Sequence, residues 1–309
     1  MLTRVLKDRF GRPLKNLRIS VTSRCNFSCI YCHNEGLPKG ELSELSVSSY
    51  DIIGEACRRL GILSAKLTGG EPLIRKDIVD IVRALAQHLD EVSITTNGYY
   101  LSELAPKLAN AGLKRVCVSL PSMDPERYAS ITGVRALDRV VKGIEVAYEC
   151  NLNPLTINVV VLKWFTIGDL EKLIDLASRY EARVRLIELE PLGLGAEVFA
   201  KLHKPLEELV AYLERVASAK YVRDLHARPV YVLSNGVEVE IVAWFGNPRF
   251  CRFCDRVRLS PNGILYPCIA RRVGVSIEEC LSLSRERAIE CVIRKIIEVN
   301  ELREPFYKY

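Results

Sequence analysis

The stretch that decides the fold is SAKLTGGEPLIRKDIVDIVRALAQHLDEVSITT, residues 64–96. Residues 64–68 and 91–96 are short segments typical of buried strands, and residues 76–88 between them carry the apolar periodicity of a helix. A strand, a helix and a second strand joined by short turns form the repeating unit of a parallel sheet with covering helices. The stretch therefore predicts the α/β fold class.

The same alternation continues on both sides of this unit. Residues 17–21 predict the preceding strand, and residues 48–60 predict a helix with Ser48 as its N-cap. Further along, we expect strands over 115–120, 155–161 and 183–189, and helices over 101–111, 137–150 and 168–180. Right-handed crossovers curl six such strand–helix units into a partial (β/α)6 barrel of the TIM type.

The pattern changes near residue 220. Residues 221–233 and 237–242 alternate like half-exposed strands, and Asn235-Gly236 between them is a strong signal for a tight hairpin turn. A helix is expected over about 276–300. We therefore divide the chain into a core barrel, residues 1–220, and a smaller C-terminal α+β domain, residues 221–309.

Charge and hydropathy narrow the class of protein. The 309 residues include 44 Lys and Arg against 38 Asp and Glu, a formal net charge of +6. This excess is small and dispersed, so we expect no nucleic-acid partner, although converging basic side chains would suit a small anionic substrate. The sequence has no apolar run long enough to span a membrane, and residues 1–15 lack the apolar segment of a secretory signal. We therefore expect a cytoplasmic protein without membrane contact.

Eleven cysteines are the most unusual feature of the composition. Their number is odd, and a disulfide framework is a poor fit for a reducing cytoplasm. For Cys57, Cys117 and Cys150, which lie in apolar-periodic segments, we expect core packing. Six others form two tight groups, Cys25, Cys29 and Cys32, then Cys251, Cys254 and Cys268.

The first group has the spacing Cys-x3-Cys-x2-Cys on a loop directly after the first strand. Three thiolates this close can hold three corners of a [4Fe–4S] cluster and leave one iron without a protein ligand. An incompletely ligated metal is a site for chemistry. The alternatives are a structural zinc with a fourth ligand such as His33, or three unrelated cysteines.

This spacing, with Tyr31 just before the last cysteine, resembles the signature of the radical S-adenosylmethionine (SAM) superfamily, and so does Gly69-Gly70-Glu71-Pro72 after the second strand. The resemblance implies that SAM chelates the open iron. One electron then splits SAM into methionine and a 5′-deoxyadenosyl radical, which abstracts a hydrogen atom from the substrate. It also implies a barrel whose active site lies at the C-terminal ends of the strands.

The second group, Cys-x2-Cys-x13-Cys with Arg256 and Arg258 inside it, resembles the C-terminal cluster of the GTP 3′,8-cyclase family, molybdenum cofactor biosynthesis protein A. The resemblance implies a second [4Fe–4S] cluster, whose open iron contacts the guanine of GTP. It implies that the two arginines bind the nucleotide, for which guanidinium forks are well suited. A zinc ribbon completed by Cys280 or His226 is the alternative.

Other matches to this family cover nearly the whole chain. They imply that SAM is bound by Tyr31, Gly70, Ser119 and Glu190, and GTP by Arg18, Lys66, Thr95, Lys163, Arg256 and Arg258. Lys66 stands where the family usually has an arginine, which keeps the charge but loses the bidentate fork. The departures are Glu190 in place of a methionine, Pro121 in place of an aspartate, and an end at residues 304–309 without the family's Gly-Gly.

The implied reaction is the first step of molybdenum cofactor biosynthesis. It is a lyase reaction that converts GTP to (8S)-3′,8-cyclo-7,8-dihydroguanosine 5′-triphosphate by removing the ribose 3′ hydrogen and joining the 3′ carbon to guanine C8. The implied partners are a one-electron donor and the downstream cyclic pyranopterin monophosphate synthase, and a homodimer is compatible with the family. Two other functions stay open, a radical SAM enzyme that modifies peptides or tetrapyrroles with an auxiliary cluster, and a non-enzymatic zinc-binding module.

Overall fold

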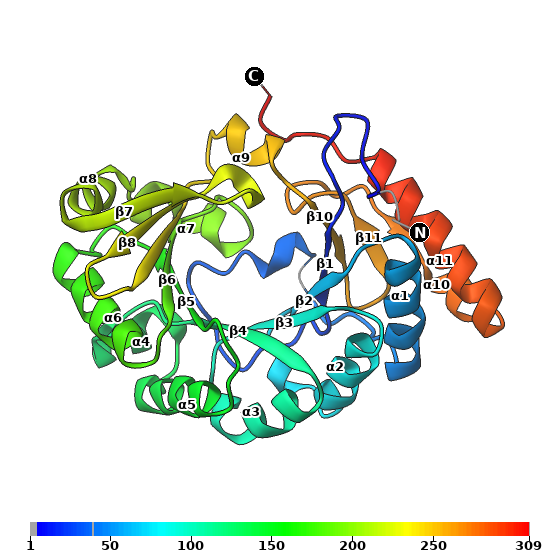
Figure 1. Cartoon of the computed structure of the whole chain (residues 1–309), viewed down its shortest axis with the longest axis horizontal. Helices are drawn as coiled ribbons and strands as arrows, with labels where there is room; N and C mark the ends of the chain where they lie inside the picture. Colours follow the sequence, from blue (N-terminus) through cyan, green and yellow to red (C-terminus); the bar gives the residue numbers. More distant parts are fainter. Residues whose placement is uncertain (1–4, 39, 309) are drawn as a thin grey trace.

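The computed structural model describes residues 5–38 and 40–308. Its centre is a curved sheet of six parallel strands that pair in chain order. They are β1 (Asn16–Ser20), β2 (Ser64–Thr68), β3 (Glu91–Thr96), β4 (Leu113–Ser119), β5 (Thr156–Val161) and β6 (Arg183–Glu188). Figure 1 shows these strands around a central opening with helices outside them, which confirms the predicted partial barrel.

The covering helices also follow the prediction closely. They are α1 (Val47–Arg59), α2 (Ile78–Ala86), α3 (Leu101–Asn110), α5 (Leu137–Glu149) and α6 (Ile167–Arg179). One cap was predicted wrongly, because α1 begins after Ser46 rather than Ser48, and the Ser46 side chain makes no capping hydrogen bond to the helix backbone.

Helix α4 (Pro125–Thr132), which lies between β4 and α5, was not predicted from the sequence. Its boundaries nevertheless have clear local causes. Asp124 accepts a hydrogen bond from the backbone N–H of Arg127, Pro125 occupies the first turn, and Gly133 ends the helix at a φ of 77°.

Strands from the C-terminal third extend both edges of the same sheet. β7 (Ala217–Val222), β8 (Pro229–Leu233) and β9 (Glu238–Val242) continue it beyond β6, and β10 (Arg256–Leu259), β11 (Ile264–Tyr266) and β12 (Val275–Ser276) continue it beyond β1. β8 and β9 form the hairpin predicted at Asn235-Gly236. The predicted strand over 221–233 is interrupted by the 3₁₀ turn η3 (Leu225–Ala227). β7 spans residue 220, so the division of the chain there stays a prediction.

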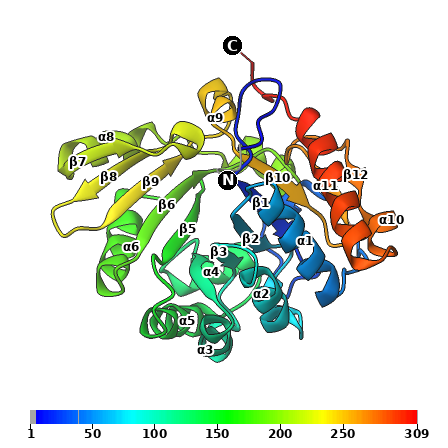
Figure 2. The ribbon, with the colours of Figure 1, turned by 45° about the vertical axis from the view of Figure 1, so that its right-hand side comes forward.

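The remaining helices are α7 (Leu194–Leu202), α8 (Glu207–Val216), α9 (Pro248–Arg252), α10 (Glu278–Leu281) and α11 (Arg285–Glu301), with 3₁₀ turns η1 (Asn34–Gly36) and η2 (Pro72–Ile74). The helix predicted over 276–300 is thus split in two. Cys280 of α10 and Cys291 of α11 form a disulfide, which corrects the expectation that disulfides fit this chain poorly. Figures 1 and 2 show α11 beside α1 on the outside of the barrel.

The alternation of side chains along each strand separates the core from the barrel interior. In β1, Leu17 and Ile19 are fully buried in the core cluster that lies under the helices, whereas Arg18 between them lines a cavity inside the barrel. The strands therefore present polar and charged side chains to the interior. No helix in the described part of the chain is both long and apolar enough to cross a membrane.

Candidate active site

A cavity of about 540 Å³ lies inside the barrel and brings together nearly all the residues that the sequence predicted. It is lined by Cys25, Cys29, Cys32, Cys251, Cys254 and Cys268, by Tyr31, Gly70, Ser119 and Glu190, and by Arg18, Lys66, Thr95, Arg256 and Arg258. Residues more than 200 positions apart in the sequence therefore share one space, because β10 pairs directly with β1.

Lys163 is the exception. Asn158 and Val160 of β5 line the cavity, but the strand ends at Val161, and Lys163 lies exposed on the following turn. Its backbone N–H donates to the Leu202 carbonyl oxygen at 2.9 Å. The structure does not bring Lys163 to the other predicted nucleotide-binding residues.

The loop of residues 25–32 is held against the barrel rim by the glycine turn after β2. Gly70 N–H donates to the Thr22 carbonyl at 2.8 Å, and Glu71 N–H donates to the Arg24 carbonyl at 2.8 Å. A Cβ atom at Gly70 would lie 2.0 Å from the Arg24 carbonyl oxygen, so a larger residue does not fit there. The turn at which the resemblance implies a SAM contact, at Gly70, therefore also packs closely against the segment that leads into the cysteine loop.

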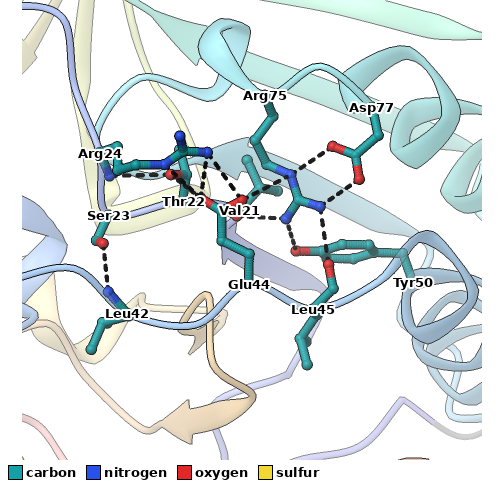
Figure 3. Close-up of polar contacts among 10 residues, drawn as sticks. All are labelled: Val21, Thr22, Ser23, Arg24, Leu42, Glu44, Leu45, Tyr50, Arg75 and Asp77. Atoms are coloured by element: carbon teal, nitrogen blue, oxygen red, sulfur yellow. Dashed lines mark hydrogen bonds and ion pairs between the residues drawn. The ribbon is translucent and has the colours of Figure 1, made fainter.

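Arg75 anchors the start of this loop, as Figure 3 shows. Its guanidinium group donates to the carbonyl oxygens of Val21 at 2.8 Å and Leu45 at 3.0 Å, and it pairs with Asp77 at 2.6 Å. Arg75 is only 5% exposed. It thus joins the end of β1 to the segment that leads into α1.

Glu44 completes the anchor (Figure 3). Its carboxylate accepts hydrogen bonds from the Thr22 hydroxyl at 2.5 Å and from Arg24 at 3.1 Å, and it lies 3.7 Å from Arg75. Two charged side chains therefore fix the residues that lead into the cysteine loop: Arg75 binds Val21, and Glu44 binds Thr22 and Arg24.

The thiols of the first group fit an iron–sulfur cluster by their chemistry. Burial raises the pKa of Cys25 to about 11, and burial together with Cys32 and Cys25 raises the pKa of Cys29 to about 12. Such thiols keep their protons at neutral pH until a metal cation binds the sulfur and the proton is released to solvent, because the thiolate is the form that binds metal. All three are free in this structure. In the described ranges, no three His, Cys, Asp or Glu side chains are gathered around a single-ion site.

The second group is fixed by long-range contacts to its backbone. Arg12 donates to the Cys251 carbonyl at 3.0 Å, and Arg303 donates to the Cys254 carbonyl at 2.6 Å. The three thiols are free, and they line the same cavity as the first group. They therefore offer a second set of three thiolate ligands.

Cys280 and His226, the two residues that could complete a zinc ribbon, both make other contacts in the structure. Cys280 is consumed by its disulfide with Cys291, so that alternative is wrong. His226 is buried, and its ring stacks on Phe250 with centroids 3.7 Å apart. Burial and the nearby Arg256 hold the pKa of His226 well below its usual range, so this imidazole is neutral.

The basic residues form a row across adjacent strands. Arg258 of β10 pairs in register with Arg18 of β1, which pairs with Lys66 of β2. All three line the cavity. Lys66 donates to the sulfur of Cys117 at 3.0 Å, a contact that the expectation of simple core packing for Cys117 did not include. A row of cations inside a cavity is suited to a polyanionic ligand.

Several lining residues were not predicted. Arg185 of β6 and Arg228 before β8 both line the cavity and both pair with Glu240 of β9, at 2.6 Å and 3.1 Å. The signal for Arg185 was present, because residues 183–186 and 238–241 alternate charged and apolar positions. Glu304 and Phe306 near the end of the chain also line the cavity.

Glu35 is the least expected of these residues. It lies on η1, three positions after Cys32, and its carboxylate binds both Arg18 and Arg258. In Figure 1 the blue loop that carries η1 lies at the central opening of the barrel. No sequence pattern indicated this contact.

Comparison with known proteins gives the family. Residues 19–177 match the model of the Radical SAM superfamily, and residues 182–307 match that of Molybdenum Cofactor Synthesis C. The chain is 41% identical over 98% of its length to a "Probable GTP 3′,8-cyclase" of Saccharolobus solfataricus, of which 99% is covered. It is 42% identical over 99% of its length to a protein of the same name from Aeropyrum pernix, of which 88% is covered.

Solved structures with the same fold are more distant. Streptococcus suis SuiB bound to S-adenosylmethionine gives a TM-score of 0.66 at 18% identity, over 89% of this chain and 72% of that one. The anSMEcpe structure with bound AdoMet gives 0.58 at 16% identity, over 90% and 80%. These two likenesses concern the fold alone. The matches of both family models, together with relatives of over 40% identity along nearly the full chain, mean that this protein belongs to the radical SAM superfamily and, within it, to the family of its relatives named GTP 3′,8-cyclase.

Proposed function

We propose that this enzyme converts GTP to (8S)-3′,8-cyclo-7,8-dihydroguanosine 5′-triphosphate, the GTP 3′,8-cyclase reaction of molybdenum cofactor biosynthesis. One observation carries the proposal most directly, namely that two groups of three free thiols and a row of cations line a single cavity. The names of its full-length relatives give the same reaction. The family uses SAM and two [4Fe–4S] clusters.

Each thiol group has a distinct place in this proposal. Cys25, Cys29 and Cys32 would hold the cluster that, when bound, supplies the electron for cleavage of SAM. Tyr31, Gly70, Ser119 and Glu190 share the cavity with these cysteines and are the proposed SAM contacts. Cys251, Cys254 and Cys268 would hold the second cluster, beside the base of the nucleotide.

The cation row would bind the triphosphate. Arg256, on the same strand as Arg258, supports this, because its buried Nε atom lies 3.8 Å from an Asp255 carboxylate oxygen and makes no hydrogen bond to the described residues. A buried donor without a partner is costly unless a ligand satisfies it. Arg18, Lys66 and Arg258 surround the same space, and Thr95 lies on the neighbouring strand β3. The barrel walls would exclude water from the reacting atoms.

Lys163 is retained only as a weaker candidate for a phosphate contact. Lys163 lies exposed on the turn after β5, so its side chain would have to reach back to the cavity to contact a phosphate. Arg185, one strand further along and inside the cavity, is better placed for the same role.

The wider setting is part of the proposal. We place the enzyme in the cytoplasm, with a one-electron donor and with cyclic pyranopterin monophosphate synthase as the consumer of its product. We also propose the division into a core barrel, residues 1–220, and a C-terminal domain, residues 221–309, from the change of sequence pattern near residue 220. A homodimer is compatible with the proposed function.

The deciding experiment is anaerobic incubation of reconstituted protein with SAM, a reductant and GTP, followed by mass analysis. A product isomeric with GTP, together with 5′-deoxyadenosine, supports the proposal. 5′-Deoxyadenosine without any GTP-derived product refutes the substrate, and then a peptide or tetrapyrrole is the next substrate to test.

A further inference from the structure

Two of the arginines proposed to bind phosphate already hold an anion that belongs to the chain itself. Arg18 grips the Glu35 carboxylate with two hydrogen bonds, from Nη2 to Oε1 at 2.7 Å and from Nε to Oε2 at 2.9 Å. Arg258 donates to Oε2 from its Nη1 atom. The Thr68 hydroxyl donates to Oε1 at 3.0 Å. The carboxylate therefore accepts four hydrogen bonds.

This carboxylate is shielded from solvent. The Glu35 side chain is 4% exposed, and those of Arg18 and Arg258 are 16% and 17% exposed. Because the two arginines are neighbours in the register of β1 and β10, they form one binding site for one anion. Arginine forks bind carboxylate and phosphate with the same bidentate geometry.

The loop that carries Glu35 is built to place it there. Asn34 and Glu35 have positive φ angles of 48° and 51°, which residues with side chains rarely adopt. The Glu35 N–H donates to Nδ1 of His33 at 2.9 Å. A Cβ atom at Gly36 would lie 2.2 Å from the Ile269 carbonyl oxygen. The loop thus connects the first thiol group to the segment just after Cys268, and the strained backbone points to a functional constraint.

We propose that Glu35 is an internal competitor for the phosphates of the substrate: its carboxylate occupies the phosphate position between Arg18 and Arg258 and is displaced when a polyphosphate binds. The proposal rests on the proposed function for the identity of the nucleotide. Its physical basis is that one pair of guanidinium groups cannot give its full set of hydrogen bonds to two anions, and that two adjacent anions repel each other. Glu35 would then be a specificity-determining residue, because a ligand must outweigh an existing ion pair to enter.

The test compares binding to the wild-type protein and to the Glu35→Gln variant, which removes the charge and keeps the shape. Inorganic tripolyphosphate is the first probe, titrated calorimetrically into anaerobically reconstituted protein. We expect its dissociation constant to fall by about tenfold or more, the scale of a hydrogen bond to a charged group. Guanosine, which carries no phosphate, should bind equally to both proteins.

Two controls separate this effect from general damage. Glu126→Gln removes a negative charge from an exposed side chain outside the cavity and should leave tripolyphosphate binding unchanged. Glu35→Asp keeps the charge but shortens the reach, so its affinity should lie between those of the wild type and Glu35→Gln. Iron and sulfide contents of the variants must match the wild type, because Glu35 lies close in sequence to Cys32.

Equal or weaker tripolyphosphate binding by Glu35→Gln overturns the proposal, since Glu35 would then orient the arginines rather than compete with the ligand. An order of affinities in which Glu35→Asp binds more weakly than the wild type overturns it as well. If neither protein binds tripolyphosphate, the cations do not form a phosphate site and the proposal fails. Turnover of GTP by the wild-type enzyme is measured in a separate experiment. A wild-type enzyme that converts GTP while the Glu35 variants fail the binding test would refute the role of Glu35 and leave the proposed function intact.

Discussion

The Nζ atom of Lys66 lies 3.0 Å from the Sγ atom of Cys117 inside the barrel. Burial lowers the pKa of Lys66 to about 8. Burial alone would raise the pKa of Cys117, but Lys66 and Arg185 outweigh it and lower that pKa to about 6. Between these two values the pair is an ammonium and a thiolate, so the thiolate helps to keep Lys66 charged for a phosphate ligand.

This pair predicts how GTP affinity depends on pH. As the pH rises through about 8, Lys66 loses its proton and its attraction for phosphate is lost. Binding of GTP should therefore weaken about threefold between pH 7.5 and 8.5, a range in which neither the phosphates nor the guanine N1–H of the ligand titrates appreciably. In Cys117→Ala the thiolate is absent, so the weakening should begin at lower pH. Equilibrium dialysis with GTP across this range measures both midpoints.

Two variants serve as controls for this pH dependence. Cys57→Ala removes another buried thiol, on α1 and outside the cavity, and should leave the midpoint where it is. Lys66→Arg keeps its charge at every pH tested and should flatten the profile. A midpoint that is the same in the wild type, Cys117→Ala and Lys66→Arg would show that Lys66 does not sense this pH range.

The double variant Arg256→Ala with Arg258→Ala should abolish the GTP-derived product while cleavage of SAM survives. Each lost hydrogen bond to a charged phosphate weakens binding by about 10- to 100-fold. The proposed SAM contacts, Tyr31, Gly70, Ser119 and Glu190, lie outside β10, and so they remain. The measurement is the yield of GTP-derived product and of 5′-deoxyadenosine from the same reaction. Arg272→Ala, at an exposed position, is the matched control, and undiminished GTP turnover in the double variant would exclude both arginines from substrate binding.

Arg75→Met should destabilise the protein and loosen the loop that carries the first thiol group. The substitution leaves the carbonyl oxygens of Val21 and Leu45 and the carboxylate of Asp77 without their donor. Asp77 is 37% exposed, so the loss comes mainly from the two carbonyl oxygens left without this donor, at about 1–3 kcal/mol for each buried group. Anaerobic urea unfolding and the iron content per chain are the measurements. Arg83→Met, at an exposed ion pair with Asp80, should change the free energy of unfolding by less than about 0.5 kcal/mol. Equal losses in the two variants would refute the anchoring role of Arg75.

The barrel could be predicted from the sequence because its signals are local. The strand and helix periods alternate over residues 17–189, and each unit repeats the same pattern. Even the missed helix α4 has local signals, Asp124 and Pro125 at its start and Gly133 at its end. The cysteine groups were found for the same reason, since the first lies within residues 25–32 and the second within residues 251–268.

The errors arise where position depends on contacts distant in sequence or on where a strand ends. The assignment of Lys163 by resemblance stays a prediction, because β5 ends at Val161 and Lys163 is not among the residues that line the cavity. Glu35 and Arg258 are 223 residues apart and meet only because β10 pairs with β1. The disulfide between Cys280 and Cys291 requires that α10 and α11 lie side by side, which the prediction of one continuous helix excluded.

The segment after Arg303 should prove to be part of the substrate site. Glu304 and Phe306 line the cavity, the Phe306 ring stacks on Trp244 with centroids 5.9 Å apart, and Glu304 pairs with Arg271 at 2.5 Å. A chain that ends at Arg303 would expose this end of the cavity to water, which competes for the polar contacts of the substrate and quenches reactive intermediates. We therefore expect weaker GTP binding and a severalfold higher ratio of 5′-deoxyadenosine to GTP-derived product.

Phe306→Ala tests the same idea without shortening the chain, because it removes only the ring that covers Trp244. Phe10→Ala removes an aromatic ring of similar exposure that does not line the cavity, and it should leave the ratio unchanged. If Phe306→Ala reproduces most of the effect of the truncation, the ring itself seals the cavity. If only the truncation has an effect, the ion pairs of Glu304 hold the segment in place and the ring is dispensable. A ratio equal to that of the wild type in both variants would mean that this segment only covers the outside of the barrel.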